Sequence, residues 1–130
     1  MEIPVLFVSD TSDVTKFINV WKLKKFNMKV MIAKSSEIRK YKKVKDLFLI
    51  VYYHVNLTSS LLSIKSRVKC SVYNNPFLIP SDLIPKIDFF LTSERLHSRM
   101  LANIGVDDDN IYTIGRHIDI ERYEKNNIYS

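Results

Sequence analysis

Two titratable residues stand at the ends of apolar runs that predict buried strands. Asp10 follows residues 3–9, and His54 lies near the end of residues 46–55, the most apolar stretch of the chain. Ligands of parallel sheets bind beyond the carboxyl ends of the strands. An imidazole or a carboxylate at such an end can accept a proton from a bound hydroxyl group. His54 and Asp10 are therefore the candidate catalytic residues, either one serving as the base.

Other polar residues follow the remaining predicted strands and are candidate substrate contacts: Thr11, Asn75, Ser93, Glu94 and His117. Structural roles remain open for several of them. Asp10 and Ser93 are also typical helix caps, and Asn75, just before a proline, is a typical turn residue. His54 can equally be a structural residue at a strand end. The three histidines lack the local spacing of metal ligands, so we expect no metal site.

The elements that must position these residues alternate regularly along the chain. Apolar runs predict strands at residues 3–9, 28–33, 46–55, 69–73, 87–91 and 111–114, with helical patterns at residues 14–25, 35–43, 56–69 and 94–104. Strands that alternate with helices form parallel sheets through right-handed crossovers. The sequence therefore predicts one Rossmann-like α/β domain over residues 1–130, with about six mainly parallel strands and helices on both faces.

Two of the predicted helices carry specific expectations. Asn56 is the expected cap of the helix over residues 56–69. In the last helix, Leu96, Met100 and Ile104 recur every four residues with Leu101 beside them, and they predict one apolar face. Gly105 stands where a left-handed C-cap is needed.

Residues 87–123 also carry a family resemblance. Their order is an apolar strand, Thr-Ser-Glu, a helix, Gly-Val, an acidic turn, Ile-x-x-Ile-Gly, x-x-Ile-Asp and x-x-Arg-Tyr. This order resembles the end of the N-terminal, acceptor-side domain of GT-B type glycosyltransferases. The strand that ends at His54 resembles the family's strand end near the acceptor site. His117 stands where the family usually has glycine, and residues 10–13 replace a glycine-rich loop that is frequent in the family.

The resemblance implies a transferase that works with a second domain. In the family that domain binds the nucleotide-sugar donor, and the 130 residues contain no counterpart. We therefore expect no cofactor on this chain itself, a glycan or glycosylated acceptor at its strand ends, and a donor site supplied by a partner chain or by homo-oligomerisation. An alternative is a non-catalytic interaction or assembly module that kept the fold, as would suit a small viral protein.

The amino-acid composition excludes several classes of protein and site. The chain has only two glycines, Gly105 and Gly115, so it cannot build the glycine-rich loops that cradle nucleotide phosphates. Its single cysteine, Cys70, excludes a disulfide framework within the chain. No apolar run is long enough to span a membrane, and the N-terminus reads as a strand instead of a secretion signal. We therefore expect a cytoplasmic location, or the host cytoplasm for a viral protein.

Charge supports a third hypothesis. Residues 1–45 contain eleven Lys/Arg and four Asp/Glu, whereas residues 46–130 contain nine Lys/Arg and ten Asp/Glu. A lysine-rich N-terminal third could bind nucleic acid or another polyanion. Nucleic acid is the less favoured partner, because the chain shows no aromatic and basic motif of an RNA- or DNA-binding module.

Overall fold

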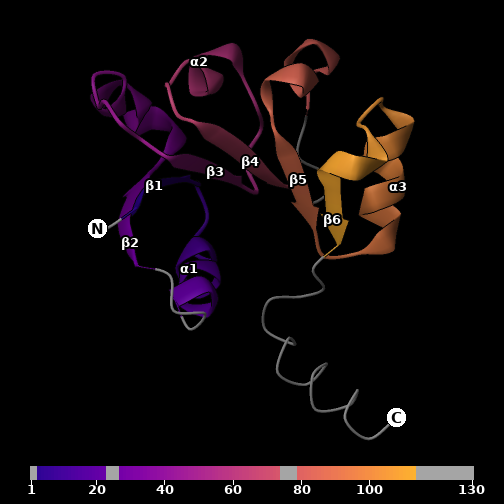
Figure 1. Ribbon diagram of the computed structural model, residues 1–130, viewed down its shortest axis with the longest axis horizontal. Helices are drawn as coiled ribbons and strands as arrows, with labels where there is room; N and C mark the ends of the chain where they lie inside the picture. The colour runs from indigo at the N-terminus through magenta and orange to yellow at the C-terminus, as the bar shows by residue number, and fades with distance from the viewer. Residues whose placement is uncertain (1–2, 23–26, 74–78, 114–130) are drawn as a thin grey trace, which may run out of the picture.

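A computed structural model describes residues 3–22, 27–73 and 79–113 of the chain (Figure 1). These residues contain one six-stranded sheet with the strand order β2-β1-β3-β4-β5-β6. Every pairing between neighbouring strands is parallel. The strands are β1 (Ile3–Val8), β2 (Met28–Ala33), β3 (Leu49–Tyr53), β4 (Val68–Tyr73), β5 (Phe89–Thr92) and β6 (Ile111–Thr113). The predicted Rossmann-like α/β fold is confirmed.

The helical segments cover the two faces of the sheet unequally. They are α1 (Val14–Lys22), η1 (Ser35–Tyr41), α2 (Ser59–Leu62), η2 (Ser81–Lys86), α3 (Arg95–Asn103) and η3 (Asp108–Asn110), where η denotes a 3-10 helix. The connection from β1 to β2 runs toward one edge of the sheet, and the later connections run toward the other edge. Because crossovers are right-handed, α1 lies on one face, whereas η1, α2, η2 and α3 lie on the other (Figure 1).

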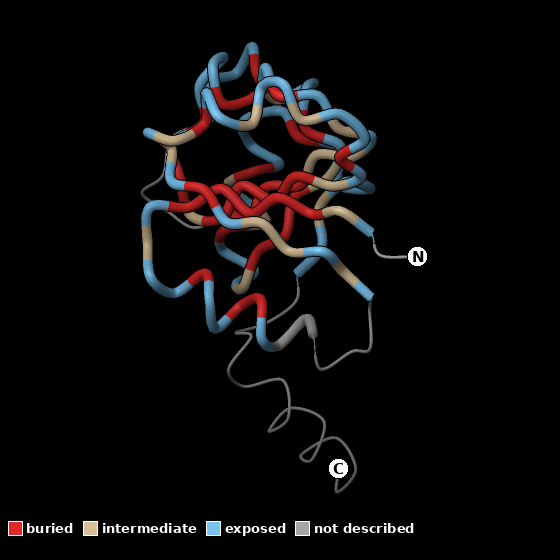
Figure 2. The backbone as a smooth tube through the Cα atoms, turned by 90° about the vertical axis from the view of Figure 1, so that its left-hand side faces the viewer, coloured by how far each residue is buried: buried red, intermediate tan, exposed pale blue. Residues whose placement is uncertain are grey.

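Strand β3 shows why its sequence is apolar without alternation. Ile50 and Tyr52 belong to the core under η1 and α2, whereas Val51 and Tyr53 belong to the core under α1. All four are at most 1% exposed. Figure 2 shows this continuous buried layer between the exposed outer segments. A strand covered on both faces needs apolar side chains at every position.

The segment after β3 differs from the prediction. Residues 56–69 do not form one helix, because α2 is a single turn and Val68 already belongs to β4. Its cap is Thr58, whose hydroxyl accepts a 3.2 Å hydrogen bond from the Leu61 N–H, and not Asn56. Serine and threonine compete for backbone hydrogen bonds and so favour helix ends over helix interiors. The hydroxyl-rich sequence here therefore shortens the helix.

Helix α3 is rotated relative to its predicted orientation. Leu96 is 62% exposed and Ile104 is 44% exposed, whereas His97 and Leu101 are buried. The Ser98 hydroxyl fixes this rotation, because it lies 2.8 Å from the Thr92 hydroxyl of β5 and 2.6 Å from the Thr113 hydroxyl of β6. The predicted apolar face was therefore wrong at Leu96 and Ile104, whereas Leu101 of the same prediction is buried.

The N-cap of α3 differs from the sequence prediction, whereas its C-cap agrees with it. The N-cap residue is Glu94, not Ser93. At the other end the predicted glycine cap is confirmed, since Gly105 has a φ of 106° and Val106 N–H donates to the Leu101 carbonyl at 3.0 Å. This is the Schellman arrangement, in which the chain turns through a left-handed residue.

Candidate functional site

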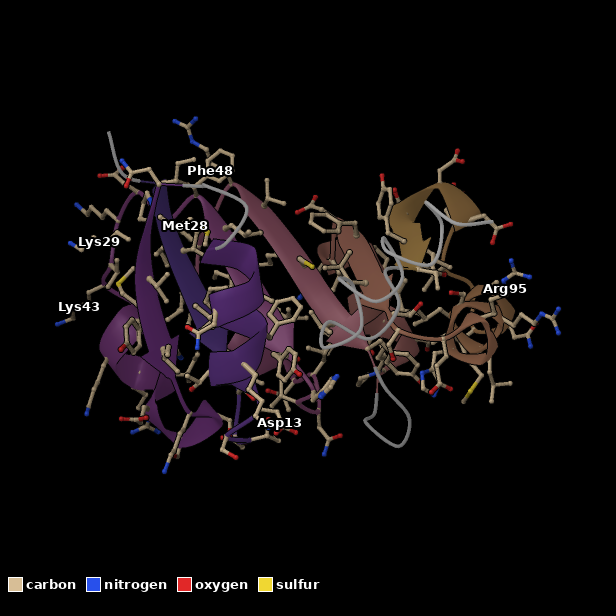
Figure 3. All side chains as sticks on the ribbon, turned by 90° about the horizontal axis from the view of Figure 1, so that it is seen from below. Asp13, Met28, Lys29, Lys43, Phe48 and Arg95 are labelled. Atoms are coloured by element: carbon tan, nitrogen blue, oxygen red, sulfur yellow. The ribbon has the colours of Figure 1, made fainter. Side chains whose placement is uncertain are left out.

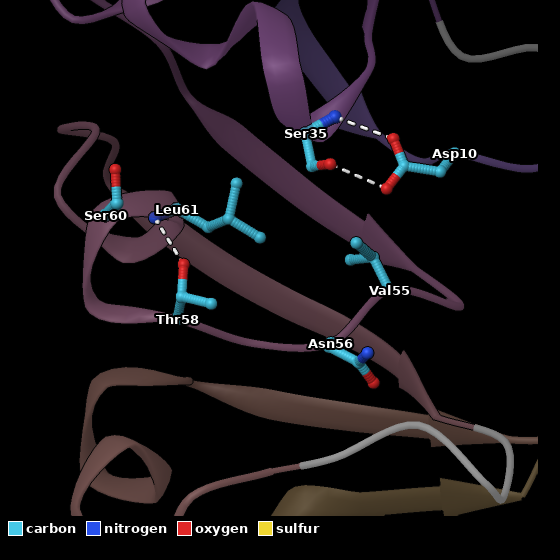
Figure 4. A pocket seen from close by; sticks show the side chains of 7 residues that line it. All are labelled: Asp10, Ser35, Val55, Asn56, Thr58, Ser60 and Leu61. Atoms are coloured by element: carbon cyan, nitrogen blue, oxygen red, sulfur yellow. Dashed lines mark hydrogen bonds between the residues drawn. The ribbon is translucent and has the colours of Figure 1, made fainter.

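The strand order creates a switch point between β1 and β3. The chain leaves β1 toward one edge of the sheet and crosses to the opposite side when it enters β3. In open α/β sheets, loops diverge at such a point and leave a crevice at the carboxyl ends of the strands. A hollow of about 270 Å³ lies there, open to solvent (Figure 4). Its lining residues are Asp10, Ser35, Val55, Asn56, Thr58, Ser60 and Leu61.

One wall of the hollow is a carboxylate held in place by a neighbouring loop. Asp10 follows β1, and Ser35 opens η1 directly after β2, the strand beside β1. The two carboxylate oxygens of Asp10 accept hydrogen bonds from the Ser35 N–H at 2.8 Å and from the Ser35 hydroxyl at 2.6 Å. A carboxylate has more acceptor sites than these two donors use. Asp10 is thus pre-oriented and can still accept from a ligand.

The opposite wall begins at a turn that ends β3. His54 has a φ of 45°, which is unusual for a residue other than glycine. Its N–H still donates to the Val72 carbonyl of β4 at 3.2 Å, and its ring stacks on the Tyr53 ring with centroids 4.0 Å apart. The turn carries the next two residues, Val55 and Asn56, into the lining of the hollow. Strained backbone at a strand end is typical of functional sites.

The remainder of this wall comes from α2. Thr58 caps the helix and Ser60 lies in its only turn, and both residues line the hollow together with Asn56 (Figure 4). Val55 and Leu61 add a smaller apolar part. A carboxylate, an amide and hydroxyl groups can exchange several hydrogen bonds with a small polar molecule. The hollow is therefore chemically suited to a ligand rich in hydroxyl groups.

The structure places the predicted site residues in different locations. Asp10 lines the hollow, whereas His54 only precedes lining residues. Thr11 is engaged with Ser9, its hydroxyl lying 3.1 Å from the Ser9 hydroxyl. Ser93 and Glu94 follow β5, two strands from β3 and so about 10 Å along the sheet. The predicted contacts Asn75 and His117 lie outside the described residues.

Of the seven lining residues, only Asp10 was a predicted site residue, and the missed residues include the hydroxyl-bearing Thr58 and Ser60. Thr58 and Ser60 fall within residues 56–69, which the sequence pattern assigns to a long helix. A hydroxyl-rich run, Thr-Ser-Ser at positions 58–60, follows the most apolar stretch, residues 46–55, after two intervening residues. Such a run favours a cap or a turn over a helix interior, so it is the signal that could have placed these residues at the strand end.

Cys70 is not a candidate nucleophile for this site. It is fully buried in the middle of β4, under the α1 face of the sheet. Burial raises the pKa of the Cys70 thiol well above its usual range. A thiol must ionise to attack a substrate, so this residue acts as part of the core.

The described part of the chain offers neither a metal site nor a membrane span. None of its His, Cys, Asp and Glu side chains form a group of three that could hold a metal ion. None of its helices combines the length and the apolar character that a bilayer crossing requires. No protein-family model, curated protein or solved structure matches the chain.

Proposed function

We propose that this chain binds a hydroxyl-rich acceptor, such as a glycan, as the acceptor-side half of a glycosyl-transfer system. The observation that carries the proposal is the hollow at the switch point, with Asp10, Asn56 and Ser60 in its lining. Sugar hydroxyls both donate and accept hydrogen bonds, and these side chains supply both kinds of partner. The resemblance of residues 87–123 to GT-B glycosyltransferases points to the same class of ligand.

The residues of the hollow have distinct roles in this proposal. Asp10, held by Ser35, would accept the proton of the acceptor hydroxyl as its oxygen attacks the anomeric carbon of the donor sugar and the bond from that carbon to the nucleotide phosphate breaks, releasing the nucleotide. Asn56 and Ser60 would orient the acceptor by hydrogen bonds to its other hydroxyls. Asp10 is the stronger candidate base than His54, because only Asp10 lines the hollow. The nucleotide-sugar would be held by a partner chain or a second copy.

Ligand-induced thermal stabilisation tests the binding step. A panel of simple glycans, nucleotide-sugars and free nucleotides is added to the protein, and the unfolding temperature is followed. A ligand at a hundred times its Kd stabilises the folded state by about 2.7 kcal/mol. We expect a shift with glycans, and a flat response to the whole panel would contradict the proposal.

Two neighbouring serines provide a matched pair of variants. Ser60 lines the hollow and Ser59 does not, although both are exposed residues of α2. Loss of one hydrogen bond costs about 1 kcal/mol, or about fivefold in affinity. Ser60→Ala should therefore weaken glycan binding about fivefold, whereas Ser59→Ala should leave it unchanged. An equal effect of the two substitutions would place the ligand elsewhere.

A further inference from the structure

One edge of the sheet is strongly basic. Residues 27–46, which contain the outermost strand β2 and the segment η1, hold seven Lys/Arg and two Asp/Glu. All seven cations are exposed, and only Lys40 makes an ion pair, with Glu37 at 3.7 Å. Figure 3 shows Lys29 and Lys43 pointing outward at this side of the molecule. We call this set the basic edge: Lys29, Lys34, Arg39, Lys40, Lys42, Lys43 and Lys45.

The opposite edge carries the reverse charge. Residues 79–113, which include the other outermost strand β6, hold six Asp/Glu and three Lys/Arg. Asp107, Asp108 and Asp109 follow one another shortly before β6, and all three are exposed and form no ion pair with another described residue. We call Asp107, Asp108 and Asp109 the acidic edge.

Each outermost strand also exposes one large apolar side chain. Ile32 of β2 is 47% exposed and Tyr112 of β6 is 53% exposed. Both lie on the α1 face of the sheet. Ile32 lies on the same face of β2 as Met28 and Val30, which pack against the core of that face. Tyr112 contacts Phe89 of the same core with ring centroids 5.9 Å apart. The two edges therefore match in apolar character as well as in charge.

We propose that copies of this chain associate head to tail, with the basic edge of one copy against the acidic edge of the next. If the sheet of one copy continues the sheet of the next, β2 of one copy lies beside β6 of the other. Ile32 and Tyr112 then lie on the same face of the combined sheet. Contact between copies places opposite charges against each other, so it provides a partner for the basic edge and for the acidic edge. A polyanion would engage the basic edge alone and leave the acidic edge and Tyr112 without a partner.

The geometry of the contact determines what it builds. The two surfaces are different, so the contact is heterologous, and a growing chain of copies always has one unused basic edge at one end and one unused acidic edge at the other. Such contacts form open chains unless the rotation closes a ring. The attraction between exposed charges weakens as the screening length falls from about 10 Å at 0.1 M salt to about 3 Å at 1 M salt.

Sedimentation velocity across protein concentrations at these two salt concentrations tests the proposal. One variant, Lys42→Glu with Lys43→Glu, reverses part of the basic edge. A second variant, Asp108→Lys with Asp109→Lys, reverses part of the acidic edge and keeps the Asp107 carboxylate, which accepts the Asp109 N–H at 3.1 Å. A control variant, Lys65→Glu with Arg67→Glu, makes the same change of charge as the first at exposed positions between α2 and β4.

We expect the natural chain to form larger species at 0.1 M salt and monomers at 1 M salt. Each edge variant alone should remain monomeric at both salt concentrations, a mixture of the two edge variants should associate again, and the control should behave as the natural chain does. Circular dichroism confirms that each variant is folded. A natural chain that stays monomeric at low salt, or a mixture that does not associate, would overturn the proposal. A monomer that binds single-stranded DNA through Lys42 and Lys43 would overturn it in favour of a polyanion partner.

Discussion

At the scale of single residues, two adjacent tyrosines of β3 make the fold sensitive to alkaline pH. Tyr52 and Tyr53 are at most 1% exposed, on opposite faces of the sheet. Burial, with a smaller contribution from the negative charge of Asp13, raises the pKa of Tyr53 to about 12. Burial alone raises the pKa of Tyr52. In the unfolded chain both ionise near pH 10, so above that pH the unfolded state releases protons that the folded state retains.

The buried tyrosines make the free energy of unfolding fall at alkaline pH. The stabilisation that comes from the raised pKa of Tyr53 is fully present below about pH 10 and is lost as the pH rises toward about 12. Urea unfolding at a series of pH values should show stability falling over this range. Tyr53→Phe should reduce the steepness of the fall, whereas Tyr112→Phe, at an exposed position, should not. Identical pH profiles for Tyr53→Phe and the natural chain would contradict this account.

His97 is a second residue whose environment makes a prediction. It is 7% exposed, and its ring stands edge-on to Tyr73 with centroids 6.1 Å apart. Its Nδ1 has no hydrogen-bond partner among the described residues. A buried polar atom without a partner costs about 1–3 kcal/mol. His97→Leu should therefore raise the free energy of unfolding by about 1 kcal/mol, as measured by urea unfolding. A loss of stability would show that the imidazole has a stabilising role.

At the scale of elements, the turn after α3 depends on the backbone of one glycine. Gly105 has a φ of 106°, and a Cβ at this position would meet no atom within 4 Å. The cost of a side chain is therefore conformational, about 1–2 kcal/mol for alanine in a left-handed position. Gly105→Ala should lower the free energy of unfolding by this amount, and Gly105→Asn should lower it less. Equal losses for the two variants would contradict the conformational explanation.

Helix α1 carries the packing of its face among the described elements. Phe17 contacts Phe7 of β1 and Tyr53 of β3, with ring centroids 6.2 Å and 5.0 Å apart. Truncation of a buried phenylalanine costs about 3–5 kcal/mol, a large part of the 5–15 kcal/mol that stabilise a typical domain. Phe17→Ala should therefore leave the protein near its unfolding threshold, and Phe17→Leu should cost clearly less. A small effect of Phe17→Ala in thermal unfolding would show that α1 is dispensable.

The elements differ in how well the sequence predicts them. Uninterrupted apolar runs predict the buried strands because both faces of a parallel sheet exclude water. The rotation of α3 was not predictable from periodicity, because the hydrogen bonds of Ser98 to Thr92 and Thr113 join residues of three different elements. The predicted helix over residues 56–69 was wrong for a local reason. Hydroxyl side chains form hydrogen bonds with the backbone there and confine α2 to one turn.

The residues of the candidate site also differ in how well the sequence predicts them. Asp10 was predictable, because it directly follows an apolar run and strand ends are where ligands bind. Its partner Ser35 lies 25 positions away in the sequence. Their contact depends on β2 and β1 being neighbours, which periodicity does not determine. Asn56 was expected to cap a helix, and the structure instead places it in the lining of the hollow.

At the scale of the whole molecule, strand order joins the hollow to the charge distribution. The same order, β2-β1-β3-β4-β5-β6, places the switch point near the basic edge and the acidic edge at the far side of the sheet. The acidic edge therefore lies apart from the hollow. Reversal of charge at Asp108 and Asp109 should abolish self-association and leave glycan binding unchanged, which titration of the monomer with a glycan checks.

The central claim is that the hollow between β1 and β3 binds a hydroxyl-rich acceptor. The most direct measurement is an NMR titration of the isotope-labelled protein with a glycan identified in the thermal panel. We predict that backbone amide shifts concentrate at Ser35, Asn56 and Ser60 in the hollow, and that Asp10→Asn weakens them. Shifts confined to residues outside the hollow, or no shifts with any glycan, would contradict the claim.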